Sequence, residues 1–173
     1  TDIVLAGNWF NNGGTFTEGA QTVTLDGTGA QELTSETFNN LTINKSAGTV
    51  TIEAASDVVV NNTFTMTQGT FNTGTRSLSG TANFVATGGD VQFQKTGVTI
   101  PETTGSVTCT GGMLTINGAG AQTIRDTPGA EEYHGLLLDG SGTKTLLGDI
   151  DVDSILTIDA GVILDAVSYT HLT

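Results

Sequence analysis

The sequence predicts an all-β solenoid, a stack of short strands wound into successive coils. Charged residues make up 13% of the 173 residues, hydrophobic residues 36%, and 24 residues are Gly. Helix-forming Lys, Arg, Glu and Met are scarce, whereas Thr, Val and Ile recur in short runs bounded by Gly and Asn, as is typical of strands. The strand pattern also repeats along the chain, which favours a solenoid.

Each strand is predicted where an apolar residue, Thr and a second apolar residue follow one another. Successive side chains point to opposite faces of a strand, so the apolar pair faces the core and Thr faces solvent. Turns rich in Gly, Asn and Asp separate these triplets and leave no room for helices. The triplets and their close variants are 23–25, 41–43, 50–52, 64–66, 98–100, 107–109, 114–116 and 156–158.

The same pattern returns at a longer interval. Residues 23–33 reappear 91 positions later as 114–124, and residues 57–69 match 149–161 at an offset of 92. Between them, 38–44 corresponds to 133–139 at an offset of 95. The drift implies small insertions at turns, which a solenoid tolerates and a closed barrel does not. At roughly twenty residues a coil, the chain is expected to form about seven or eight coils.

Residues matched by this repeat should face the same way. Their apolar members are predicted to be buried: Leu25, Ile116, Phe64 and Leu156. Their Thr neighbours are predicted to lie outside: Thr24, Thr115, Thr65 and Thr157. The wider predicted core consists of Leu41, Ile43, Val50, Ile52, Val58, Val60, Phe64, Met66, Val107, Leu114, Ile116, Leu136, Leu138, Ile150, Val152, Leu156 and Ile158.

Three successive segments carry a resemblance to a known family. Residues 38–44 read Phe-Asn-Asn-Leu-Thr-Ile-Asn, residues 48–52 read Gly-Thr-Val-Thr-Ile, and 60–69 read Val-Asn-Asn-Thr-Phe-Thr-Met-Thr-Gln-Gly. They resemble the repeats of large bacterial surface proteins of the adhesin and autotransporter-passenger type, broadly similar to filamentous haemagglutinin. The resemblance covers nearly all of residues 15–165. It implies a right-handed parallel β-helix at a cell surface, with no shared catalytic residues.

The chain is expected to hold one structural segment. Residues 1–165 are interpreted as a single β-solenoid, part of a longer protein. Residues 166–173 break the pattern and look like the translation of a sequencing-adapter end, the alternative being a natural final strand.

Charge and cysteine content restrict the partners. The net charge is −13 with five basic residues, so the electrostatic footprint needed for nucleic acid or anionic lipid is missing. One cysteine, Cys109, allows no intrachain disulfide and no thiolate metal cluster, and its inward position predicts a buried, inert thiol. No apolar run is long enough to insert into a membrane, and no cofactor is expected.

Asp149, Asp151 and Asp153 are candidate calcium ligands. On a strand, carboxylates at alternate positions share one face and could bind a hard cation. An EF-hand loop would need Gly and Glu where Ser154 and Ala160 stand. The favoured interpretation is therefore a solvated acidic face with Ile150 and Val152 inward, and no metal site.

Glycan-binding candidates occur at two places. Glu131, Glu132, Tyr133 and His134 combine a possible acid, a base and an aromatic platform, and two carboxylates of unequal pKa are the minimum that glycoside cleavage requires. They follow a Pro-Gly turn and read as a corner or loop. Trp9, next to Phe10, could form a platform for a sugar, or could fill a corner of the core.

The functional hypotheses rest on the predicted architecture and not on a catalytic or binding site. The leading hypothesis is a non-catalytic structural or adhesive rod segment of a secreted or cell-surface bacterial protein, contacting host or matrix glycans or proteins. The alternative is a carbohydrate-active β-helix, either a polysaccharide lyase or a glycoside hydrolase. A third is an ice- or surface-binding solenoid, suggested by Thr pairs such as Thr63 and Thr65, although these pairs do not return at one even interval.

Overall fold

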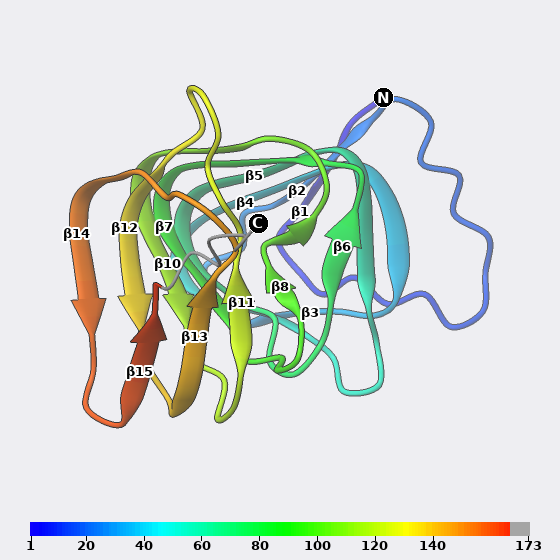
Figure 1. Ribbon diagram of the computed structural model, residues 1–173. Coiled ribbons are helices and arrows are strands. Elements are labelled where there is room, and N and C mark those ends of the chain that lie inside the picture. The colour runs from blue at the N-terminus through cyan, green and yellow to red at the C-terminus, as the bar shows by residue number, and fades with distance from the viewer. Residues whose placement is uncertain (167–173) are drawn as a thin grey trace, which may run out of the picture.

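The computed structural model describes residues 1–166, and within them the chain forms fifteen strands and no helix. Two strands that follow a turn, β4 and β5, are unusually long because they bend around a corner of the coil (Figure 1). The strands are β1 (Ile3–Leu5), β2 (Thr22–Leu25), β3 (Gln31–Leu33), β4 (Glu36–Ile52), β5 (Val58–Asn72), β6 (Leu78–Gly80), β7 (Asn83–Phe93), β8 (Thr99–Ile100), β9 (Glu102–Thr103), β10 (Val107–Ile116), β11 (Gln122–Ile124), β12 (Tyr133–Leu138), β13 (Gly142–Leu146), β14 (Val152–Ile158) and β15 (Val162–Asp165).

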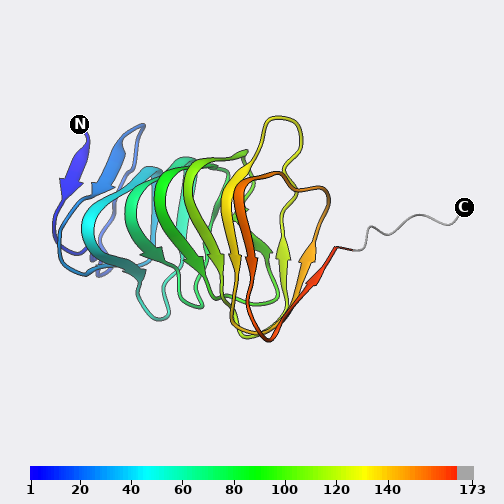
Figure 2. The ribbon, with the colours of Figure 1, turned by 90° about the vertical axis from the view of Figure 1, so that its left-hand side faces the viewer.

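The strands stack as a β-solenoid of about eight turns, which confirms the predicted fold class. The main sheet runs β1-β2-β4-β5-β7-β10-β12-β14, every neighbour is parallel, and its order follows the chain. A second, four-stranded sheet, β8-β11-β13-β15, covers the opposite wall of the later coils. In Figure 2 the coils follow one another along one axis, with the N-terminus at one end. No helix of the described residues could cross a membrane.

Inward side chains form continuous columns through the stack. Leu41 pairs with Val23 on one side and Phe64 on the other, and Phe64 pairs in turn with Phe84. The Phe64 and Phe84 rings stack with centroids 5.1 Å apart. Thirteen of the predicted core residues, from Leu41 to Leu138 and including Ile116, are buried, and so is Leu25. Burial of this apolar surface supplies the main favourable free energy of folding.

The prediction fails at the last coil. Leu156 is 42% exposed and Ile158 47% exposed, although they lie in register with the fully buried Leu136 and Leu138. Ile150 and Val152 are only partly buried. In the described part of the chain, β14 pairs with β12 along one edge and no further strand covers its other edge. The side chains point inward as expected, but burial needs a following coil.

The outward positions of the repeat are more varied than predicted. Thr24, Thr65 and Thr157 are partly exposed, whereas Thr115 is only 5% exposed. Its hydroxyl donates a hydrogen bond of 2.8 Å to the Asp90 carboxylate on the preceding coil. Thr115 also pairs with the longer side chains Gln92 and Leu137 on either side. These neighbours explain why Thr115 is covered.

Glycine is required where successive coils turn a corner in contact. Gly112 has φ of +81°, and a Cβ there would lie 2.5 Å from the carbonyl oxygen of Gly89 in the preceding coil. Gly89 itself has φ of +76° and meets Gly69 in the same way. Such positive φ values strain other residues, and the missing Cβ lets the two backbones approach.

Two buried lysines explain the repeat between residues 23–33 and 114–124. Lys144 is fully buried, and its ammonium donates to the carbonyl oxygens of Gly118 at 2.7 Å and Gly120 at 3.1 Å. It also donates to Gln122 Oε1 at 2.7 Å and to the carbonyl of Ser141 at 3.1 Å. The four oxygens form a cage: three belong to the preceding coil, and the Ser141 carbonyl belongs to the turn just before Lys144.

The first copy of the repeat builds the same cage. Lys45 donates to the carbonyls of Gly27 and Gly29 and, at 2.6 Å, to Gln31 Oε1. Burial lowers the pKa of both lysines, opposed by the nearby charges of Asp26 and Asp139 respectively. Hydrogen bonding to several oxygens compensates the cost of enclosing each ammonium.

Candidate functional site

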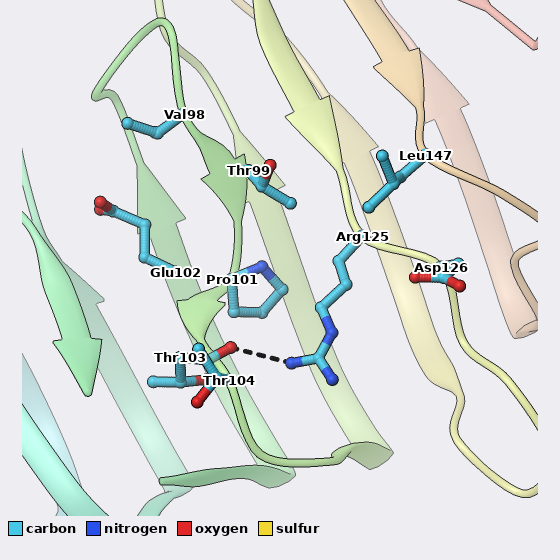
Figure 3. Close-up of a pocket in the computed structure, with 9 residues that line it drawn as sticks. All are labelled: Val98, Thr99, Pro101, Glu102, Thr103, Thr104, Arg125, Asp126 and Leu147. Atoms are coloured by element: carbon cyan, nitrogen blue, oxygen red, sulfur yellow. Dashed lines mark hydrogen bonds between the residues drawn. The ribbon is translucent and has the colours of Figure 1, made fainter. Parts of the chain in front are cut away.

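A pocket lies on the outside of the second wall, beside the turns that follow β8 and β11. Its volume is about 500 Å³. This lies within the range of small-molecule sites, roughly 300–1,000 Å³. Figure 3 shows the side chains around it, with Arg125 reaching across toward Thr103. It is lined by Val98, Thr99, Pro101, Glu102, Thr103, Thr104, Arg125, Asp126 and Leu147.

A break in strand pairing creates this pocket. Thr99 and Ile100 of β8 pair with Thr123 and Ile124 of β11, and the Arg125 amide still donates to the Ile100 carbonyl at 2.9 Å. Beyond Pro101 the two coils part, because β9 pairs back to β6 of the preceding coil. The segment between β11 and β12 instead rises as a loop above the neighbouring coils (Figures 1 and 2).

Arg125 spans this break. Its Nη1 donates a hydrogen bond of 2.8 Å to the carbonyl oxygen of Thr103, which substitutes for the missing ladder bond. Its Nη2 lies 3.8 Å from Glu131 Oε2, too far for a hydrogen bond but within ion-pair range. A guanidinium carries five N–H donors, so these contacts leave capacity for a ligand.

Glu102 is engaged on the other side of its strand. Its Oε2 accepts hydrogen bonds from Lys95 Nζ at 3.1 Å and from Ser77 Oγ at 3.0 Å. In Figure 3 its carboxylate points away from the Arg125 guanidinium. The buried Glu102 Oε1 and Thr103 Oγ1 have no hydrogen-bond partner in the structure. Glu102 therefore lines the pocket while its charge is compensated by Lys95.

The glycan candidates at 131–134 are separated by the fold. Tyr133 is fully buried as the first residue of β12, its hydroxyl donates to the Arg125 carbonyl at 2.9 Å, and burial raises its pKa. Strand alternation turns Tyr133 inward, so its ring offers no aromatic surface to a ligand. Glu132 and His134 lie partly exposed on the opposite face, and Glu131 reaches the pocket only through Arg125.

The calcium candidates are not gathered into a site. Asp149 and Asp151 precede β14, and their carbonyls accept hydrogen bonds from the amides of Thr127 and Tyr133. Asp149, Asp151 and Asp153 are exposed and alternate with the partly buried Ile150 and Val152, which pack against the core. Over residues 1–166 no group of three or more His, Cys, Asp or Glu side chains could hold a metal ion.

Trp9 packs at the first coil. Its ring meets Phe16 edge-on at 4.8 Å and Phe38 at 5.2 Å, which fits the core-filling interpretation. It also lines a second pocket of about 400 Å³, whose rim includes Phe10, 52% exposed. The Trp9 indole N–H is buried and has no hydrogen-bond partner among residues 1–166.

Cys109 is buried, as predicted, and burial raises its pKa to about 12. A thiol with such a pKa is protonated at neutral pH and is a poor nucleophile.

Outward Thr side chains align over part of the main sheet. Thr24, Thr42 and Thr65 pair in register on three successive coils, and Val85 follows Thr65 in the same column. The Thr side chains of these coils are therefore better aligned in space than the uneven spacing of Thr pairs along the sequence indicates. Bulges and turns accommodate the differences in coil length. The column of Thr ends after these three coils.

The pocket was missed by sequence reasoning, although the repeat contains a signal. Arg125 and Asp126 directly follow the 114–124 copy, at places where the 23–33 copy is followed by Thr34 and Ser35. Charged residues at positions that are neutral in the matching copy mark a departure from the purely structural pattern. The break in pairing itself is not visible in the sequence.

The fold and these features define a β-helix repeat protein. The chain belongs to the family described as "Protein of unknown function (DUF1565)", whose model matches residues 5–126. This match includes every pocket residue except Leu147. No curated protein and no solved structure matched the chain.

Proposed function

We propose that the chain is a non-catalytic rod segment of a secreted or cell-surface bacterial protein of the adhesin or autotransporter-passenger type. The observation that carries the proposal is the uninterrupted parallel pairing from β1 to β14 around continuous apolar columns. Hydrogen bonds between coils run along the stack axis, so adding coils lengthens the rod without changing its cross-section. A rod of this kind can hold adhesive surfaces at a distance from the cell.

Surface chemistry supports the same proposal. The net charge of −13 favours solubility. The outer positions are occupied largely by Thr, Asn and other uncharged polar residues, which can make many weak contacts with glycans or proteins. Host or matrix surfaces are the partners that this role implies.

A carbohydrate-active enzyme is the alternative, and the pocket beside Arg125 is the observation in its favour. Glycoside cleavage uses two carboxyl groups that face one substrate bond. Asp126 and Glu102 both line the pocket, but Glu102 is turned away toward Lys95. This arrangement supports binding over cleavage.

Two measurements test the proposed function. Antibodies raised against the segment should label intact cells of the source bacterium, and brief external protease treatment should remove the label. Labelling only after cell lysis would contradict a surface role. The purified segment should release no products from pectin, alginate and neutral polysaccharides. Turnover abolished in Asp126→Asn or Glu131→Gln would refute the non-catalytic proposal and favour the enzyme.

A further inference from the structure

The pocket beside Arg125 combines the groups that recognise an uncharged, hydroxyl-rich ligand. Pro101, Val98 and Leu147 offer apolar surface, and Leu147 is 62% exposed at the rim. Arg125 offers N–H donors, and the neighbouring Asp126 carboxylate offers acceptors. A sugar ring presents C–H groups on one face and hydroxyls at its edge, which matches this division of apolar and polar lining.

The charge of the pocket selects among sugars. Lys95 compensates Glu102 on the far side of the strand, so Arg125 and Asp126 are the charged groups left facing the pocket. Their charges cancel. Glu131 lies behind Arg125 at 3.8 Å and further reduces the field of the guanidinium. The Asp126 carboxylate would therefore repel a carboxylate ligand, with no uncompensated cation to bind it. The Arg125 guanidinium would likewise repel a polyamine.

We propose that this pocket binds one neutral sugar residue of a surface polysaccharide. Arg125 donates to, and Asp126 accepts from, adjacent hydroxyls of the sugar, whose ring lies against Pro101 and Leu147. The inference deepens the proposed adhesive function and rests on it. Because the pocket is an open depression on one wall of the rod, a single site binds weakly, and strength comes from several rods acting together.

Titration of the isotope-labelled protein with neutral gluco-, manno- and galacto-oligosaccharides tests the proposal by NMR. At least one series should bind in the millimolar range and shift the amide signals of residues 98–100, 102–104, 125–126 and 147. Asp126→Asn should weaken binding about three- to tenfold and Arg125→Lys about tenfold, by loss of hydrogen bonds to the sugar. The matched control Asp153→Asn, an exposed carboxylate on β14, should bind as the parent protein does.

Several outcomes would overturn the proposal. These are no binding of any neutral series, tighter binding of oligogalacturonate or of a polyamine, and shifts centred on Trp9 and Phe10 in place of Arg125. If the Arg125→Lys variant does not fold, two measurements still test the proposal: the positions of the amide shifts in the parent protein, and the sugar affinity of the Asp126→Asn variant. Loss of this site would leave surface labelling and the absence of turnover unaffected, so it can be told apart from failure of the rod proposal.

Discussion

Cys109 and Tyr133 are two titratable side chains that the core encloses, with exposures of 2% and 0%. Burial disfavours the charged form of each and raises its pKa, for Cys109 to about 12. In the unfolded chain a thiol ionises near its ordinary value, so the folded state holds its proton over a wider pH range. The stabilisation is complete below the unfolded pKa and is lost as pH rises toward the folded one.

Alkaline pH should therefore destabilise the protein through Cys109. Between pH 8.5 and 10 we expect the free energy of unfolding to fall by about 1–2 kcal/mol more in the parent protein than in Cys109→Ala. Comparing the two removes the contributions of Tyr133 and the lysines, which both proteins share. Urea unfolding at several pH values measures the difference, and parallel pH curves for the two proteins would contradict the prediction.

Substitution of Gly112 tests how much the close approach of two coil backbones at a corner contributes to stability. We expect Gly112→Ala to destabilise the fold by about 3 kcal/mol or more, because positive φ and the contact with Gly89 act together. Gly97 is the matched control, since its φ is +72° but nothing lies within 4 Å of an added Cβ. Gly97→Ala should cost about 1 kcal/mol, the strain alone. Equal losses in the two variants by thermal unfolding would show that contact between coils adds nothing.

At the scale of elements, the turn before a strand is held by a side chain from the next coil. In each cage the Gln amide also donates back: Gln122 Nε2 donates to the carbonyls of Phe93 at 3.1 Å and Lys95 at 2.8 Å. Three successive coils are thus joined by Gln122 and Lys144. The equivalent Gln31 and Lys45 join the first coils. At these turns the hydrogen bonds of the Gln and Lys side chains take the place of the backbone strand pairing that joins the coils elsewhere.

Removing Lys144 should weaken this connection. Lys144→Met removes the ammonium that donates to the four oxygens of the cage, although the Gly118 carbonyl and Gln122 Oε1 each keep one backbone N–H donor. We expect a loss of about 2–4 kcal/mol in the free energy of unfolding. The loss of hydrogen bonds should outweigh relief from enclosing a charge. Arg76→Met is the control, because it removes a partly exposed cation that makes no side-chain hydrogen bond in the structure; it should change stability by less than about 0.5 kcal/mol. A Lys144→Met protein as stable as the Arg76→Met protein would refute the cage.

For the whole molecule, the two ends of the stack differ. At the first coil, Trp9 and Phe16 pack over Phe38 and cover part of the core. At the last described coil, the edge of β14 is unpaired and exposes Ile155, Leu156 and Ile158. Unpaired edges with apolar side chains are templates for further strand pairing.

The purified segment should consequently associate through its ends despite its charge. Light scattering should show oligomers that grow with concentration and dissociate on dilution. Replacing Leu156 and Ile158 together by Lys should raise the concentration for association at least tenfold, because charges would enter the unpaired columns. The matched control is a single Lys at Ile163, an exposed β15 residue outside those columns. Strictly monomeric behaviour of the parent protein at high concentration would contradict the prediction.

The sequence by itself determined the architecture and most of the core. Alternation of apolar residues with Thr determines which side chains face inward, and repetition places them in columns, because both follow from backbone geometry that holds for every strand. Leu25 and Phe64 could therefore be assigned correctly. The resemblance to surface proteins added a proposed location, which the geometry alone does not supply.

Tertiary structure alone decided the cages, the pocket and the exposure of the last coil. Nothing in the sequence around Lys144 marks it as buried, because the preceding coil supplies most of the oxygens for its ammonium. Tyr133 belongs to a segment interpreted as a corner or loop, and its place in β12 turns it inward. The pocket depends on where pairing between β8 and β11 stops and β9 pairs back to β6, which is settled by contacts more than twenty residues apart along the chain. Burial and pairing are properties of neighbouring coils together, so no single stretch of sequence contains them.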